Sequence, residues 1–189
     1  MTVPATAQKN LSENDVNVSS VNDLPESFRL AMRRLIATVT IIASGDERTR
    51  AGMVATAVMS VSADPPSLVI GVNREAGVWT SIHNTGRFSV NLLATEHTHL
   101  VPPFSGVLQG EERFTLGDWL THTSHVPHLA DAVVTLFCRV DAHLDYGTHT
   151  LFVGAVEEIH LSQESGEPLL WRNGSFANAV LLDQLLDES

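Results

Sequence analysis

The sequence is poor in the features that mark several common classes of protein. It contains one cysteine, Cys138, in the apolar run VVTLFCRV, so a framework of disulfide bonds is excluded and a reduced core thiol is expected. Its 11 lysine and arginine residues are scattered, and 22 aspartate and glutamate residues give a formal net charge of −11. Because nucleic acids and anionic membranes are recognised by clustered basic side chains, we expect neither as a partner.

The chain also lacks the short motifs of several enzyme classes. It contains no GxGxxG, no GxxxxGK[ST] and no GxSxG, so a Rossmann fold, a P-loop and a serine-hydrolase elbow have no support. No apolar run approaches the length of a membrane span. Residues 1–20 have no apolar run behind a basic start, so we expect neither a secretory signal nor an anchor. We therefore expect a cytoplasmic location. The expected organisation is a disordered tail over residues 1–24 and one domain over residues 25–189.

Nine histidines invite the hypothesis of a metal site, which we do not adopt. His122, His125 and His128 are three residues apart in a predicted loop, and His97 is next but one to His99. No cysteine or carboxylate stands at ligand spacing beside the trio. We interpret these histidines as solvated loop residues and predict no metal site.

Hydrophobic periodicity predicts many strands and few helices. A short helix is expected from Pro25, with Phe28, Ala31, Met32 and Leu35 on one face. A second helix is expected over residues 76–84, and loop with short helices over residues 96–127. Strands are expected from residue 37, around residue 52, and over residues 67–72, 87–94, 133–146 and 148–161.

Two features complete the predicted fold. Gly147 separates the last two long strands and indicates a hairpin. At the C-terminus, Ala177, Val180, Leu181 and Leu185 could line one helical face. Because strands do not alternate with helices, we expect a mainly β protein, a closed antiparallel barrel with a few peripheral helices.

The segment GMVATAVMSVSADPP, residues 52–66, is the most informative stretch. Its small side chains allow a flat ligand to approach the backbone, where main-chain groups could pair with the pyrimidine edge of a flavin. Hydroxyls such as Thr56, Ser60 and Ser62 could meet the ribityl chain. The alternative is a barrel strand packed tightly through small residues, and composition alone favours that alternative.

Two further residues have both a functional and a structural interpretation. His149 follows the Gly147 turn and could donate a proton or hydrogen bond near a reduced flavin, or it could close the hairpin. Trp171 could stack on a ring system or fill the core.

In their order and spacing, seven segments resemble the short-chain flavin reductase family from about Phe28 to Phe176. They are FRLAMRRLIATVTIIAS, GMVATAVMSVSADPP, GRFSVNLL, PPFSG, VPHL, GTHTLFVGAVEEI and PLLWRNGSF. Members of this family are reductase components of two-component flavin-dependent monooxygenases. The resemblance implies an FMN-binding, Greek-key-like split β-barrel that forms a homodimer, with flavin near the subunit interface. It also implies that NADH or NADPH reduces FMN or FAD, which then serves a partner oxygenase.

The resemblance assigns roles to individual positions. Contacts to the isoalloxazine and ribityl groups fall on Ala55, Thr56, Ser60, Val61 and Ser62. Asn73 and Ser81 are expected near the ribityl-phosphate end, Phe104 and His149 beside the nicotinamide, and Trp171 where the family often has tyrosine. His149 is the expected catalytic residue.

Three departures from the family pattern stand in this sequence. Val54 replaces a threonine beside the flavin, and Ala76 and Val78 stand where relatives offer serine and threonine to the phosphate. Thr148 replaces an aspartate before His149, which lowers the charge beside that histidine. Two alternatives stay open. One is a non-catalytic split-barrel flavin-binding sensor or carrier, for which Ala76 and Val78 are the best evidence, and the other is a reductase that holds FMN tightly and acts on its own small substrate.

Overall fold

The structure is a computed structural model that describes residues 23–162 and 166–181. The described residues divide into two compact units, with the boundary between Leu35 and Ile36. In the first unit, α1 (Leu24–Met32) begins with Pro25 in its first turn and carries an ion pair between Glu26 and Arg29. The predicted helix is confirmed, although it ends before Leu35. The predicted tail lies outside the described residues as far as residue 22.

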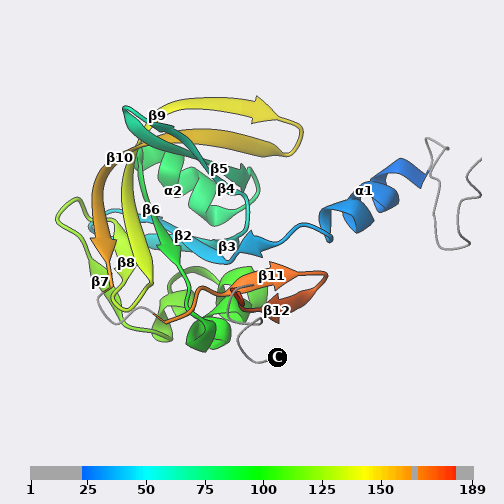
Figure 1. Ribbon diagram of the computed structural model, residues 1–189. Helices are drawn as coiled ribbons and strands as arrows, with labels where there is room; N and C mark the ends of the chain where they lie inside the picture. Colours follow the sequence, from blue (N-terminus) through cyan, green and yellow to red (C-terminus); the bar gives the residue numbers. More distant parts are fainter. Residues whose placement is uncertain (1–22, 163–165, 182–189) are drawn as a thin grey trace, which may run out of the picture. The chain divides into compact units, whose positions relative to one another are not determined.

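The second unit is built on a seven-stranded antiparallel sheet with the order β3-β2-β6-β9-β10-β5-β4 (Figure 1). Its strands are β2 (Thr40–Gly45), β3 (Arg50–Ala55), β4 (Val58–Ala63), β5 (Pro66–Asn73), β6 (Arg87–Leu92), β9 (Val134–Tyr146) and β10 (His149–Leu161). Each strand predicted from the sequence is confirmed. The long β9–β10 hairpin turns at Gly147, whose φ of 57° lies in the left-handed region that glycine favours.

Strand β2 separates two hydrophobic cores, and all six of its residues are buried. Ile42 belongs to the first core, whereas its neighbours Ile41 and Ala43 belong to the second. This alternation follows from the two-residue period of a strand, which sends successive side chains to opposite faces. Both faces of β2 are therefore covered, and its two buried polar side chains, Thr40 and Ser44, are hydrogen-bonded to backbone carbonyls.

Helix α2 (Gly77–Thr85) covers the first core. Val78 and Ile82, one turn apart, are fully buried against the sheet. The helix contacts β2 and β3 at one end of the strand order and β5 near the other. The sheet therefore curves so that both ends approach the same helix (Figure 1).

Short elements cover the second core. They are η2 (Thr95–Leu100), η3 (Pro103–Val107) and η4 (Gly110–Thr115), followed by the two-stranded β7 (Trp119–Thr121) and β8 (Pro127–Leu129). The predicted loop with short helices is confirmed, and the β7–β8 hairpin was not predicted. Among the described residues, no helix is long and apolar enough to cross a membrane.

A second sheet of three strands contains β1 (Ala37–Thr38), β11 (Leu170–Arg172) and β12 (Ser175–Ala177). The C-terminal helix that we predicted is wrong at Ala177, which pairs with Leu170 in a strand. Val180 and Leu181 follow β12 outside any helix, and Leu185 lies outside the described residues. The cause is a two-residue turn at Asn173 and Gly174, which brings β12 back onto β11.

Candidate functional site

A pocket of about 220 Å³ lies where the two sheets and the helical segment meet. It is lined by Val39, Val54, Ala55, Thr56, Val101, Ser105, Trp171 and Phe176. Three of the eight residues, Ala55, Thr56 and Trp171, were predicted from the sequence to bind the cofactor. The lining is mainly apolar, with the hydroxyls of Thr56 and Ser105 as its polar side-chain groups.

One wall of this pocket is aromatic. Trp171 and Phe176 are paired across β11 and β12, and their rings meet edge to face with centroids 5.3 Å apart. The turn between them places Asn173 at φ 50° and Gly174 at φ 84°, as a type I′ hairpin requires. Trp171 is 37% exposed, so its ring fills no closed core and remains available to a ligand.

The opposite wall ends in a short link between the two edge strands of the main sheet. Thr56 and Ala57 connect β3 to β4, and the Gly71 N–H donates to the Ala57 carbonyl at 3.0 Å. A Cβ on Gly71 would lie 3.3 Å from the Ala57 Cβ, so glycine permits this close approach. The link is thereby held against the middle of β5.

Asn73 and His149 lie near the same end of the sheet. They face each other in the β5–β10 register, two residues along β5 from Gly71, which corresponds to about 7 Å. The His149 Nδ1 atom lies 2.9 Å from the Thr148 hydroxyl, and the Arg74 N–H donates to the Thr148 carbonyl at 3.0 Å. The fold therefore brings His149 and Asn73 towards the Thr56 side of the pocket.

Tyr146 is a residue of this region that the sequence analysis missed. It pairs with His149 across the hairpin, so both side chains lie on one face of the sheet, and Tyr146 is 80% exposed. It is the only tyrosine in the chain. The sequence does contain a signal for this residue: Gly147 indicates a two-residue hairpin turn, and such a turn places Tyr146 opposite His149.

Ser60, Val61 and Ser62 follow along β4, which forms an edge of the main sheet. All three are exposed, and the register shifts between Ser60 and Ser62, which marks a β-bulge at Val61. No strand of the described residues pairs with the outer side of β4, so its N–H and C=O groups are available to a ligand. Ser62 lies about 20 Å along the strand from Thr56, so only an extended ligand reaches both.

Ser81 and Phe104 have structural partners of their own. The Ser81 hydroxyl donates to the Ser44 hydroxyl at 3.0 Å, within a network at the C-terminal half of α2. Phe104 is 2% exposed and packs its ring against Phe114 and Trp119. The next residue, Ser105, faces the pocket instead. The ligand contacts predicted for Ser81 and Phe104 stay predictions.

The first turn of α2 follows Asn73. Val78 is fully buried in the first core, so its side chain is directed away from any phosphate. Ala76 is the N-cap residue, and no side chain caps the helix there. The Asn73 side-chain oxygen accepts the Glu75 N–H at 3.0 Å and shapes this turn. The first backbone N–H groups of the helix and the nearby Arg74 are the groups that can meet an anion.

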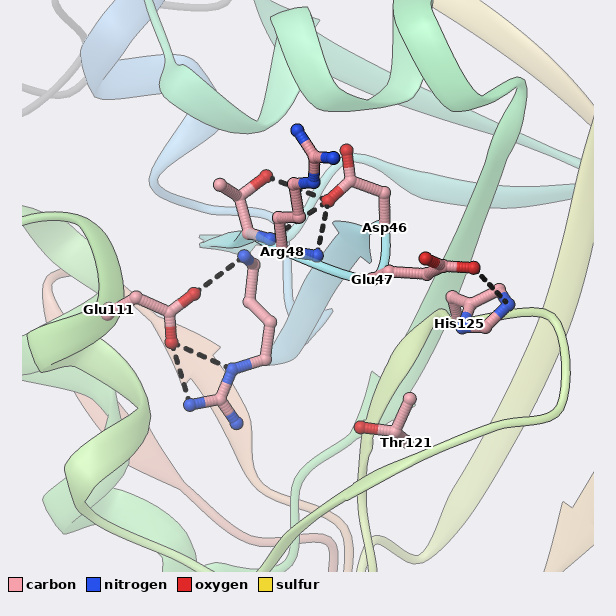
Figure 2. Close-up of a pocket in the computed structure, with 8 residues that line it drawn as sticks. Asp46, Glu47, Arg48, Glu111, Thr121 and His125 are labelled. Atoms are coloured by element: carbon pink, nitrogen blue, oxygen red, sulfur yellow. Dashed lines mark hydrogen bonds and ion pairs between the residues drawn. The ribbon is translucent and has the colours of Figure 1, made fainter.

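A second, larger hollow of about 350 Å³ is lined by charged groups that bind one another (Figure 2). Glu111 accepts the Arg50 N–H at 2.7 Å and pairs with its guanidinium at 2.8 Å, which ties η4 to β3. Asp46 accepts the backbone N–H groups of Arg48 and Thr49, and these two bonds lower the pKa of its carboxyl. We interpret this hollow as the outer side of the contact between β3 and η4. That contact supports the smaller pocket, which β3 also lines.

The histidines differ from our prediction of solvated loop residues. His97 and His128 are buried at 4% and 8% exposure, so the prediction is wrong for both, whereas His99 and His125 are exposed. His122 stacks on Phe137 with ring centroids 4.2 Å apart. Among the described residues, no three histidine, cysteine, aspartate or glutamate side chains stand ready to hold a metal ion together.

The chain is similar to known proteins over most of its length. The model of the flavin reductase like domain matches residues 32–179. The reductase component of the FADH2-dependent resorcinol hydroxylase of Rhizobium sp. (strain MTP-10005) is 40% identical over 157 residues, covering 82% of this chain and 87% of that protein. The FMN reductase (NADH) RutF of Agrobacterium fabrum is 36% identical over 146 residues, covering 77% of this chain and 83% of that protein.

A solved structure shares the fold as well. The crystal structure of a flavin reductase domain protein from Arthrobacter sp. FB24 superposes with a TM-score of 0.77 at 30% identity, covering 84% of this chain and 98% of that chain. The matched family model covers most of the chain, including the pocket, the β4 edge and the His149 turn. The chain belongs to the flavin reductase like domain family.

Proposed function

We propose that this protein uses NADH to reduce FMN or FAD and releases the reduced flavin to a partner oxygenase in the cytoplasm. The observation that carries the proposal is the pocket of Ala55, Thr56 and Trp171, followed two residues along the chain by β4, whose outer edge pairs with no strand among the described residues. The relatives support the remaining parts, since one is named as an NADH-dependent FMN reductase and another as the reductase component of a hydroxylase.

The residues present fit a flavin. A pocket of about 220 Å³ accepts a ring system but is smaller than the 300–1,000 Å³ typical of sites that enclose whole ligands. The ribityl-phosphate chain therefore extends out of the pocket along the protein surface, where backbone and hydroxyl groups can bind it. A ligand that is only partly enclosed exchanges readily, as a flavin used as a substrate must.

The flavin, when bound, supplies the chemistry of accepting a hydride from the nicotinamide. The protein contributes orientation and electrostatics: Trp171 holds one side of the ring, and main-chain N–H groups of the β4 edge stabilise developing negative charge on the pyrimidine side. His149 holds a hydrogen bond or proton at the nicotinamide side. Thr148, bonded to the His149 Nδ1, sets the orientation of that ring.

The phosphate end is assigned to the turn between β5 and α2. Backbone N–H groups at the start of α2 and the guanidinium of Arg74 replace the hydroxyls that Ala76 lacks. Arg74 lies 3.9 Å from the Asp145 carboxylate, and Arg87 is likewise paired with Glu157, so either guanidinium must leave a carboxylate partner to bind the phosphate. Arg74 is assigned this role because it directly follows Asn73 in the turn before α2. We expect Arg74→Ala to raise the KM for FMN about tenfold with little change in kcat.

The first test of the proposed function is NADH or NADPH oxidation at 340 nm with free FMN or FAD, in four combinations. We expect turnover with NADH and one flavin well above the protein-free rate. His149→Ala should slow turnover without abolishing flavin binding, whereas His99→Ala, at an exposed position outside the pocket, is the matched control. Absence of turnover in every combination refutes the proposal in favour of a non-catalytic flavin-binding protein.

Two further measurements separate the remaining alternatives. Flavin that copurifies and survives dialysis identifies a reductase that keeps FMN and acts on its own small substrate. Analytical ultracentrifugation tests the proposed homodimer, whose interface we place beside the flavin pocket. A monomer at micromolar concentration contradicts that part of the proposal.

A further inference from the structure

The β9–β10 hairpin places an acidic side chain beside the arginine assigned to the flavin phosphate. Asp145 lies on β9, two residues before Gly147, and its carboxylate is 3.9 Å from the Arg74 guanidinium. The two side chains are 54% and 46% exposed, so the pair is accessible to a ligand. The inference drawn from this pair rests on the proposed function, since it concerns the phosphate of a bound flavin.

The Asp145 carboxylate is fixed from the buried side of the hairpin. Asp145 is paired with Thr150 in the β9–β10 register, and the Thr150 hydroxyl donates to the Asp145 Oδ1. The same hydroxyl accepts the Trp79 Nε1–H of α2 at 2.8 Å. Thr150 is 1% exposed, and a hydroxyl that both accepts and donates a hydrogen bond has a defined orientation. The position of the carboxylate is therefore built into the fold.

The Arg74 guanidinium is held less firmly than its backbone. The Arg74 N–H donates to the Thr148 carbonyl at 3.0 Å, and its side chain donates to the Gly147 carbonyl. The distance to the Asp145 carboxylate exceeds that of a direct hydrogen bond. The bond to Gly147 uses one of the five N–H donors of a guanidinium, so other donors can turn towards an anion.

The two charges act on a phosphate in opposite directions. A guanidinium attracts the phosphate of FMN, whereas a carboxylate repels it and also attracts the guanidinium away from it. Between exposed charges a few ångströms apart, such an effect changes an affinity by about fivefold. A flavin that must leave after its reduction needs moderate affinity, which a competing carboxylate provides.

From these contacts we propose that Asp145 is a positioning residue that competes with the flavin phosphate for Arg74 and so weakens the binding of FMN. When FMN binds, the guanidinium turns from Asp145 to the phosphate. When the flavin leaves, the guanidinium returns to the carboxylate. Asp145 acts through Arg74 and not on the reacting ring, so it governs the binding of the flavin and not the reduction step.

The variant Asp145→Asn tests the proposal, because it removes the charge and keeps an oxygen that can accept the Thr150 hydroxyl. The Kd for FMN, measured by quenching of FMN fluorescence without nicotinamide, should fall about fivefold. The KM for FMN should fall by a similar factor without a rise in kcat. Riboflavin, which lacks the phosphate, should bind the variant and the parent chain equally. Damage to the fold would weaken both ligands instead of tightening one.

Asp141→Asn is the matched control. Asp141 also lies on β9, is paired with Arg139 at 3.2 Å, and its replacement makes the same change in net charge. Its affinity for FMN should equal that of the parent chain. Salt at about 0.5 M should reduce the difference between Asp145→Asn and the parent chain, because it screens exposed charges.

The double variant Arg74→Ala, Asp145→Asn tests the route through Arg74. Without the guanidinium, Asp145→Asn should change the Kd for FMN by less than about twofold. An unchanged or weaker affinity for FMN in the Asp145→Asn single variant overturns the inference, and so does an equal gain in Asp141→Asn, while flavin binding by the parent chain stands. A parent chain that binds no FMN refutes the proposed function, and the inference with it.

Discussion

Gly52 allows the sharpest test of the packing that supports the candidate flavin pocket. A Cβ at this position would lie 2.8 Å from the Phe104 Cε1 and 3.2 Å from the Ile42 carbonyl oxygen. The Phe104 ring cannot withdraw freely, because its centroid lies 5.1 Å from those of both Phe114 and Trp119. Overpacking of this kind costs about 1–3 kcal/mol, so Gly52→Ala should lower the free energy of unfolding by that amount.

The assay is chemical denaturation followed by tryptophan fluorescence, to which Trp119 beside Phe104 contributes. For a chain of this size the same loss lowers Tm by about 2–4 °C per kcal/mol. Gly77→Ala is the matched control, because no atom lies within 4 Å of the new Cβ, and its stability should be unchanged or slightly higher.

A double variant tests whether the contact with Phe104 is what requires glycine at position 52. In a Phe104→Leu background the close ring atoms are gone, so adding Gly52→Ala should cost less than half of what it costs in the parent chain. An equal loss in both backgrounds, or a stable Gly52→Ala single variant, would show that the contact with Phe104 is not what requires glycine.

Three other outcomes are expected. Ala76→Ser should cap α2 and raise the free energy of unfolding by about 1 kcal/mol, measured by thermal denaturation. Val54→Thr adds a hydroxyl to the pocket lining and should lower the KM for flavin about fivefold, whereas an unchanged KM would place the flavin away from Val54. Burial, and then Glu157, raises the pKa of the Cys138 thiol to about 12, so iodoacetamide should label it only after unfolding at pH 8; rapid labelling of the native protein contradicts that burial.

The strands of the main sheet were predictable because each combines β-branched or alternating residues with a turn signal at its end. The second sheet was not predicted, although Asn173-Gly174 is a strong hairpin signal, because the apolar spacing of Ala177, Val180 and Leu181 also fits a helix. Three-residue strands carry too little periodicity to decide between the two. The β7–β8 hairpin was missed for the same reason.

The candidate site was predictable where the sequence marks the end of a strand or a hairpin. Ala55 and Thr56 line the pocket because a strand of small residues ends there, and Trp171 lines it through its hairpin. The side of its short helix on which Phe104 lies was not predictable, because a difference of one residue decides whether Phe104 or Ser105 faces the pocket. Burial of His128 depends on tertiary packing of β8, which no local pattern reveals.

The aromatic wall of the candidate flavin pocket contains no residue of either hydrophobic core. Trp171 and Phe176 belong to the small sheet, which meets the rest of the unit through β1 and the backbone bonds of Leu169 to Val39 and Leu93. Substitutions of Trp171 and Phe176 thus alter which ring the pocket accepts without removing a buried side chain from either core. Ligand preference in this protein can consequently change while its stability is conserved, because the residues of the aromatic wall differ from the residues that form the cores.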